Sequence, residues 1–270
     1  MLLLCKLSIL KEYRNKYPTK LSWLGQVLSE LVMLTIYWYT AKAFLPNLQV
    51  LKSGVDYFSY IVVGESVLFL PSLLMTAFVR IFRSEVQQGT FEPTLLSIFS
   101  LQRSWLIQAL GLVIVEGSRL LIVFTIAIGL FNLSVSSLPT LLAVFFLQIL
   151  ALPFFAGLGL LGAAMMIILG RGDRILVLLT TGMTVLAGAY FPANVLPLGL
   201  QSILHQISPM TILLDSTRAI FQGESSFELL IQSASFLLIG SLIFSILGLA
   251  AIRASIIFHR RRSRPLFFVS

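Results

Sequence analysis

Six long apolar stretches, separated by shorter polar segments, dominate the pattern of this sequence. A bilayer core about 30 Å thick requires roughly 20 apolar residues of helix. Only helices and closed barrels satisfy all their backbone hydrogen bonds in lipid, and these stretches are too long for barrel strands. The pattern therefore predicts an all-α membrane protein with six transmembrane helices. The stretches are Leu21–Phe44, Tyr57–Val79, Ser104–Phe131, Pro139–Leu169, Ile175–Tyr190 and Leu229–Ile252.

Lysine and arginine fall mainly in alternate polar segments. If the N-terminus is cytoplasmic, only Lys42, Lys52 and Arg218 lie on the outer side, and Arg119 lies within the third stretch. Cytoplasmic loops carry an excess of Lys and Arg, so both termini are expected in the cytoplasm. The formal net charge of +8 comes from these flanks. Basic residues next to a membrane favour lipid contact, and they give no support to a nucleic-acid partner.

Composition leaves no room for an appended soluble domain, with 57% hydrophobic and 11% charged residues. Residues 1–20 mix leucines with lysines and end near Pro18, which predicts an amphipathic helix at the inner interface. Residues 21–252 form the predicted six-span domain, and residues 253–270 form a basic cytoplasmic tail. A single cysteine, Cys5, predicts neither a disulfide framework nor a metal cluster.

Two connections are too long for simple hairpins, the inner segment 80–103 and the outer segment 191–228. Long connections in compact proteins usually have a function or structure of their own. The outer segment places apolar residues on both sides of its prolines, which predicts a re-entrant helical hairpin between spans five and six. Asp215 and Arg218 within it are three residues apart and would share a helix face.

The sequence carries little that predicts bond chemistry. Gly157, Gly159 and Gly162 have dinucleotide-motif spacing, but they lie inside the fourth stretch, where small residues favour close helix packing. No G-x-x-x-x-G-K-[ST] motif occurs, so the chain cannot form a P-loop by itself. His205 and His259, the only histidines, fall on opposite predicted sides. We expect no catalytic residues, no metal and no cofactor bound by this chain.

Four ionisable residues lie within the predicted spans: Glu30, Glu65, Glu116 and Arg119. Charges in a bilayer are costly and usually face a bundle interior or a cavity. One interpretation is a structural ion pair of Arg119 with Glu116 or with Glu65. The other is that Glu65, Glu116 and Arg119 form a pathway cluster that handles substrate or protons.

Two separated segments together resemble the permease subunit of ABC-2 type exporters. The inner segment reads Arg83-Ser84-Glu85-Val86-Gln87-Gln88-Gly89-Thr90-Phe91-Glu92, and the outer reads Ala187-Gly188-Ala189-Tyr190-Phe191-Pro192 through Leu196-Pro197, followed by Ile207-Ser208-Pro209. In that family an acidic–Gly–Thr element follows span two, and a proline-rich re-entrant hairpin precedes the last span. Span count and loop placement extend the resemblance over nearly the whole chain.

The resemblance implies an exporter in a bacterial inner membrane, built as a dimer with a second copy or a homologous permease. Each permease would dock on a separate ATPase that binds the ATP and Mg²⁺. The substrate would be a lipid, a drug-like or other amphipathic molecule, or a polysaccharide. Pro93 departs from the family pattern, because the coupling helix is expected to continue past Glu92. The implied ATPase-coupling residues are Arg83, Glu85, Gln88, Gly89, Thr90 and Glu92, and the implied outer gate is Phe191, Pro192, Leu196 and Pro197.

An ion-coupled secondary transporter is the alternative hypothesis. It would use Glu65, Glu116 and Arg119 to couple an ion or proton gradient to transport. Such transporters often have broken helices near the membrane midplane, whereas the prolines here cluster toward the predicted outer face. Transport driven by a gradient without any ATPase would favour this alternative.

Overall fold

The computed structural model describes residues 2–44, 57–96, 101–131, 138–170, 173–191, 197–221 and 227–262. Every regular element within these ranges is an α-helix, which confirms the predicted fold class at this level. The helices, in chain order, are α1 (Leu2–Lys16), α2 (Lys20–Phe44), α3 (Tyr57–Gln87), α4 (Phe91–Leu96), α5 (Leu101–Phe131), α6 (Leu138–Leu169), α7 (Asp173–Leu186), α8 (Leu198–Ile207), α9 (Pro209–Phe221) and α10 (Phe227–Arg262).

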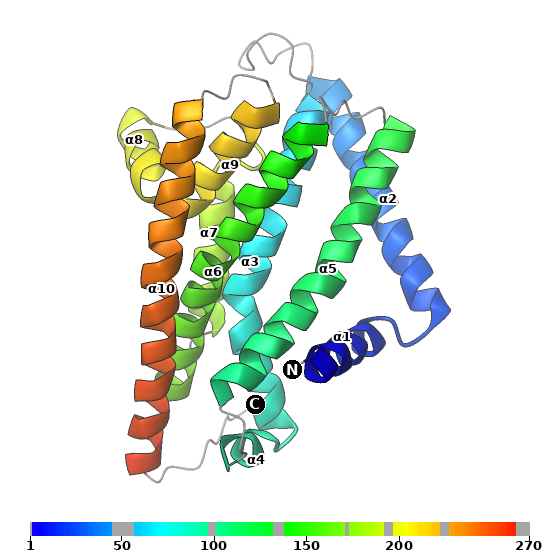
Figure 1. Ribbon diagram of the computed structural model, residues 1–270. Coiled ribbons are helices and arrows are strands. Elements are labelled where there is room, and N and C mark those ends of the chain that lie inside the picture. Colours follow the sequence, from blue (N-terminus) through cyan, green and yellow to red (C-terminus); the bar gives the residue numbers. More distant parts are fainter. Residues whose placement is uncertain are drawn as a thin grey trace.

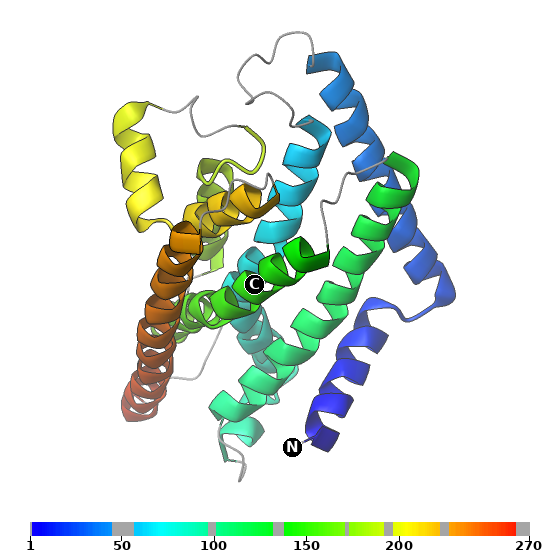
Figure 2. The same ribbon diagram turned by 45° about the horizontal axis from the view of Figure 1, so that its top comes forward.

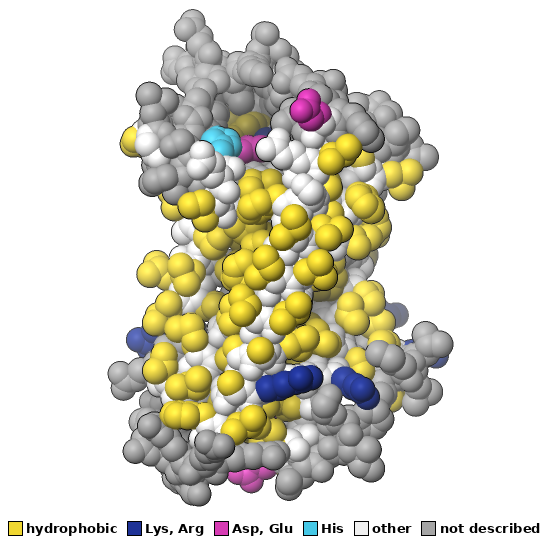
Figure 3. Space-filling model, turned by 60° about the vertical axis from the view of Figure 1, so that its left-hand side comes forward, with side chains coloured by type: hydrophobic (Ala, Val, Ile, Leu, Met, Phe, Trp, Pro, Cys, Tyr) yellow, Lys and Arg dark blue, Asp and Glu magenta, His cyan; other side chains and the backbone are white. Residues whose placement is uncertain are grey.

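Four of the described helices, α3, α5, α6 and α10, are long and apolar enough to cross a membrane. Apolar side chains cover the middle of the surface in Figure 3, and charged side chains lie toward its two ends. This distribution fits a protein embedded in a bilayer. That α2 and α7 also cross, giving six spans, stays a prediction.

The helix within the fifth predicted span, Ile175–Tyr190, is shorter than the apolar stretch. Helix α7 has 14 residues and ends at Leu186, so at 1.5 Å per residue it is only roughly 21 Å long. The chain turns at Gly188, whose φ of 85° lies in the left-handed region. Hydrophobicity alone did not reveal this stop, because the sequence stays apolar to Tyr190.

The helices form two groups. Helix α6 packs against both α3 and α10, and α7 and α9 cover this unit, whereas α5, α2 and α1 lie on its other side (Figure 1). Helix α1 packs along α5, and Figure 2 shows the two running side by side. Helices α1 and α4 and the C-terminal end of α10 lie at one end, and α8 lies at the other (Figure 1).

The three glycines of the fourth stretch are packing residues, as predicted. A Cβ added to Gly157 would lie 2.3 Å from the backbone of α10, and one on Gly159 would lie 2.4 Å from a carbonyl oxygen of α3. A Cβ on Gly162 would lie 2.3 Å from the Leu176 side chain of α7. Each glycine therefore brings α6 into close contact with a different helix.

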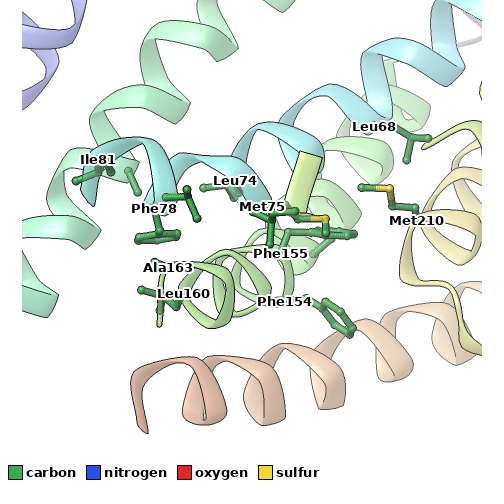
Figure 4. Packing of buried hydrophobic residues seen from close by; sticks show 14 of the residues in the cluster. Leu68, Leu74, Met75, Phe78, Ile81, Phe154, Phe155, Leu160, Ala163 and Met210 are labelled. Carbon is green, nitrogen blue, oxygen red and sulfur yellow. The ribbon is translucent and has the colours of Figure 1, made fainter. Parts of the chain in front are cut away.

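The main hydrophobic core fills the space between α3 and α6. Figure 4 shows Met75 and Phe78 of α3 facing Phe155 and Ala163 of α6. A second, smaller core joins α2, α3 and α5 near the α8 end, and the two cores are separate clusters. Its buried residues are Leu34, Ala41, Phe58, Val62, Val123 and Ala127.

Candidate functional sites

The first candidate site is the turn between α3 and α4, which we call the α3–α4 corner (residues 83–92). The Thr90 backbone N–H donates to the Glu85 carbonyl oxygen at 2.9 Å, and the Gly89 N–H donates to the Val86 carbonyl oxygen at 3.1 Å. These are the two hydrogen bonds of a Schellman motif. Gly89 supplies the required left-handed conformation with a φ of 67°. The corner is therefore a defined turn that ends α3.

Glu85 points into the protein from this corner. Its carboxylate oxygens accept hydrogen bonds from Trp105 Nε1 at 2.9 Å and from Gln108 Nε2 at 3.0 Å. The Glu85 residue is only 7% exposed. Buried carboxylates need such partners, so Glu85 ties the end of α3 to the start of α5 and does not offer its charge at the surface.

Helix α4 is fixed to the same place by an aromatic contact. The Phe91 ring lies 5.1 Å from the Phe82 ring, edge to face, and Phe82 in turn contacts Trp105. Pro93 lies in the first turn of α4, where a backbone N–H has no acceptor inside the helix. Pro93 does not interrupt a continuing helix, because α3 ends at Gln87 and a new helix, α4, begins at Phe91.

The remaining predicted coupling residues are exposed on the corner. These residues surround a turn whose backbone is hydrogen-bonded and whose side chains Glu85 and Phe91 are anchored against neighbouring helices. A rigid, exposed projection of this kind can insert into a partner with little loss of conformational entropy. The exposed residues are Arg83, Gln88, Gly89, Thr90 and Glu92.

The second candidate site is the intramembrane charge cluster, and its expected pairing is wrong. Arg119 Nε donates to Glu30 Oε1, and not to Glu116 or Glu65 as expected. Gln26 Nε2 donates to the same carboxylate one turn earlier on α2. The pair therefore joins α2 to α5. It gives the carboxylate of Glu30, a residue only 5% exposed, an oppositely charged partner.

Glu116 and Glu65 have separate partners. The ammonium of Lys16, at the end of α1, contacts the Glu116 carboxylate. The Tyr37 hydroxyl of α2 donates to Glu65 of α3. The three residues of the predicted pathway cluster are thus divided among three contacts with α1 and α2.

Glu65 and Arg119 do line one small cavity, together with Glu30 and Tyr37. Its volume is about 40 Å³, which is close to the volume of one water molecule. Glu116 is not among its lining residues. The cavity is too small for an organic substrate in this conformation, although a proton or a water could occupy it.

The third candidate site is the α8 end, which contains the predicted outer gate. Arg218 donates to the Tyr60 hydroxyl at 2.8 Å and to the Gly188 carbonyl oxygen at 3.0 Å. Its guanidinium also lies over the Tyr60 ring at 3.5 Å. The Tyr60 hydroxyl donates to the same Gly188 oxygen at 3.1 Å. Arg218 thus clamps the turn after α7 onto α3.

The gate residues are described only in part. Phe191 is half-buried beside this turn, and Pro197 is exposed at the start of α8. Pro192 and Leu196 lie outside the described residues. Asp215 contacts α8, since its Oδ2 lies 2.8 Å from Nδ1 of His205.

The roles of Lys16, Tyr60 and His205 in these sites were not predicted from the sequence. Lys16 and Tyr60 contact residues 100 or more positions away in the sequence, so no local pattern marks them. Among the described residues, no group of His, Cys, Asp and Glu side chains could hold a metal ion.

No known family profile matches the chain, and no curated protein matches it significantly in sequence. A functional assignment therefore depends on the geometry of these sites and on the resemblance in two segments of the sequence.

Proposed function

We propose that this chain is the permease subunit of an ABC exporter. It would form the translocation pathway as a dimer, with a second copy or a homologous permease, and a separate cytoplasmic ATPase would drive it. The observation that carries this proposal is the α3–α4 corner, where Gly89 and Thr90 project on a turn held by Glu85. The absence of a P-loop from the sequence agrees with an ATPase on another chain.

Helix α3 would transmit movement from the α3–α4 corner to the gate. Its 31 residues extend roughly 46 Å as one helix, from the corner to the α8 end. There Tyr57 and Tyr60 donate to the carbonyl oxygens of Tyr190 and Gly188. Displacement of the corner by closure of the ATPase would therefore reach the turn that precedes the gate. The transmitting element is a packed helix with polar contacts at both ends.

The rest of the proposal follows the resemblance. Six spans, with α2 and α7 crossing and the α8–α9 segment re-entrant, would place both termini and the corner in the cytoplasm of a bacterial cell. The chain would do no bond chemistry, and ATP with Mg²⁺ would bind the partner. An amphipathic molecule or lipid is the favoured substrate class, because the chain is 57% hydrophobic.

Co-purification tests this proposal. The tagged chain is solubilised from its native membranes in mild detergent, and the associated ATPase is identified by mass spectrometry and by ATP hydrolysis. Glu92→Lys and Gly89→Pro should each release the ATPase, the second because proline lacks the N–H that bonds Val86. Gly89→Asn should retain it, because asparagine tolerates a positive φ. Glu228→Lys, the same reversal at an exposed residue of the other end, should also retain it.

Absence of an ATPase from the wild-type preparation, or equal retention by every variant, would contradict the proposal. An ion-coupled transporter would then be favoured, and the small cavity at Glu65 and Arg119 is the observation that supports it. In that case Glu65→Gln should abolish transport driven by a proton gradient in liposomes that contain this chain alone.

A further inference from the structure

A groove lies between α8, α9 and α10 at the predicted outer end. Its volume is about 480 Å³, which is within the range of sites for small organic ligands. Ile212, Leu230 and Phe236 line it with apolar surface, and His205, Asp215 and Gln232 contribute polar groups. At this end of the molecule Figure 3 shows the histidine next to an acidic side chain.

Among the described residues that line this groove, Asp215 is the acidic one. Burial raises the pKa of this carboxyl, and the nearby His205 and Arg218 only partly oppose the effect. Arg218 donates its hydrogen bonds to Tyr60 and to backbone carbonyl oxygens, on the side of α9 that faces α3. A carboxylate has about four lone-pair positions, so contact with one imidazole nitrogen leaves capacity for another donor.

The surroundings of Asp215 favour a ligand that is both apolar and positively charged. The ring of Phe236 and the aliphatic side chain of Ile212 offer an apolar wall, and an aromatic face also attracts cations. The whole chain has a formal net charge of +8, so it has no general attraction for cations. Specific binding of a cation would therefore need a local acid such as Asp215.

We propose that the groove between α8, α9 and α10 binds an amphipathic organic cation. The apolar body of the ligand would pack against Ile212 and Phe236, and its protonated nitrogen would donate to the Asp215 carboxylate. The inference concerns binding by this chain alone, so it goes beyond the proposed function and does not depend on an ATPase.

Direct binding to the purified full-length chain in lipid nanodiscs tests the inference. The probe is rhodamine 6G, a fluorescent amphipathic cation with N–H groups, and its fluorescence polarisation is measured against empty nanodiscs. Asp215→Asn keeps the shape of the side chain and removes its charge, so the Kd should rise at least tenfold. Gln232→Trp, at an exposed position on the groove, should block binding by filling it. Glu228→Gln removes an exposed acid of α10 outside the lining and should change the Kd less than twofold.

A second probe separates charge from hydrophobicity. N-phenyl-1-naphthylamine is neutral and amphipathic, and it should bind at least tenfold more weakly than rhodamine 6G. Equal binding of the cation by wild type and Asp215→Asn, with Gln232→Trp also unaffected, would overturn the inference. So would equal loss in Glu228→Gln and Asp215→Asn, or no binding above empty nanodiscs. Thermal unfolding of each variant within a few degrees of wild type establishes that the groove is intact.

Discussion

The two helix groups of this protein are held together by different chemistry. In the α3–α6–α10 unit, glycines let backbones approach one another, and Gly157 and Gly248 face each other between α6 and α10. In the α1–α2–α5 group, two ion pairs join the helices beside the smaller apolar core, namely Lys16 with Glu116 and Glu30 with Arg119. Close backbone contacts are the mark of the first interface, whereas long charged side chains bridge the helices of the second.

This difference indicates which part can move. A close-packed interface has few alternative arrangements, because any displacement loses many contacts at once. Long charged side chains can keep or exchange partners while their helices shift. We therefore expect the α3–α6–α10 unit to move as one body when the corner is displaced, while α1 and α2 adjust against it.

Filling the glycine contact should have the largest effect on stability. In Gly157→Ala the new methyl group would meet the α10 backbone, and backbone cannot move aside as a side chain can. We expect a loss of about 3 kcal/mol, the upper part of the usual range for overpacking. Thermal unfolding in detergent measures it. Gly117→Ala has open space at the added Cβ and should be neutral or slightly stabilising; equal effects at both positions would refute the packing argument.

Breaking the Arg119–Glu30 pair should cost less. Arg119→Met leaves Glu30 with Gln26 as its remaining described donor, and an under-satisfied buried charge costs about 2 kcal/mol. Chemical denaturation in mixed micelles measures the loss. The double variant Arg119→Met with Glu30→Gln should recover most of it, because no unpaired charge remains. If the double variant were as unstable as the single one, the pair would not be the source of the cost.

Substitutions at Gly89 in the corner should change the stability of the protein only slightly, but they should strongly weaken docking of the ATPase where they distort the turn. A Cβ on Gly89 meets nothing within 4 Å, so only its φ of 67° opposes a side chain. Gly89→Ala should therefore cost about 1 kcal/mol, the conformational penalty of the left-handed region. Gly25→Ala, also with open space but without a positive φ, is the control and should not be destabilising. A loss of stability beyond about 3 kcal/mol in Gly89→Ala would show that the added methyl group meets packed atoms outside the turn.

The smallest effect is expected where α1 meets α5. Ser8 is buried and its hydroxyl donates to the Ile107 carbonyl oxygen at 3.2 Å. Ser8→Ala should cost about 0.5 kcal/mol, near the lower end for a neutral hydrogen bond. Hydrogen exchange of the α1 amides should accelerate roughly twofold while α6 stays unchanged. Unchanged exchange in α1 would mean that this bond does not hold the helix.

Local patterns in the sequence predicted much of the fold. The apolar stretches gave the long helices, and the spacing of Gly157, Gly159 and Gly162 within one of them gave the packing face. The end of α7 could not be predicted from hydrophobicity, because the stop comes from the conformation of Gly188 inside an apolar run. Pro93 could have been placed correctly, since proline is acceptable in the first turn of a new helix.

The partners of the charged residues could not be predicted. Arg119 and Glu116 are one helical turn apart, which favours pairing on sequence alone. The structure brings Glu30 to Arg119 from 89 positions away and brings Lys16 to Glu116 from α1. Glu85 is a similar case, because the resemblance implied that its charge docks the ATPase, whereas in the structure it is buried and bonded to Trp105.

Photocrosslinking shows which protein lies against the α3–α4 corner in the membrane. A benzoylphenylalanine replaces Gln88, an exposed residue of the α3–α4 corner, and in a matched control it replaces Gln206, an exposed glutamine at the α8 end. Irradiation of native membranes should attach a P-loop ATPase to position 88 and not to position 206. No ATPase adduct at position 88, or equal adducts at both positions, would contradict the proposal that this corner couples the permease to ATP hydrolysis.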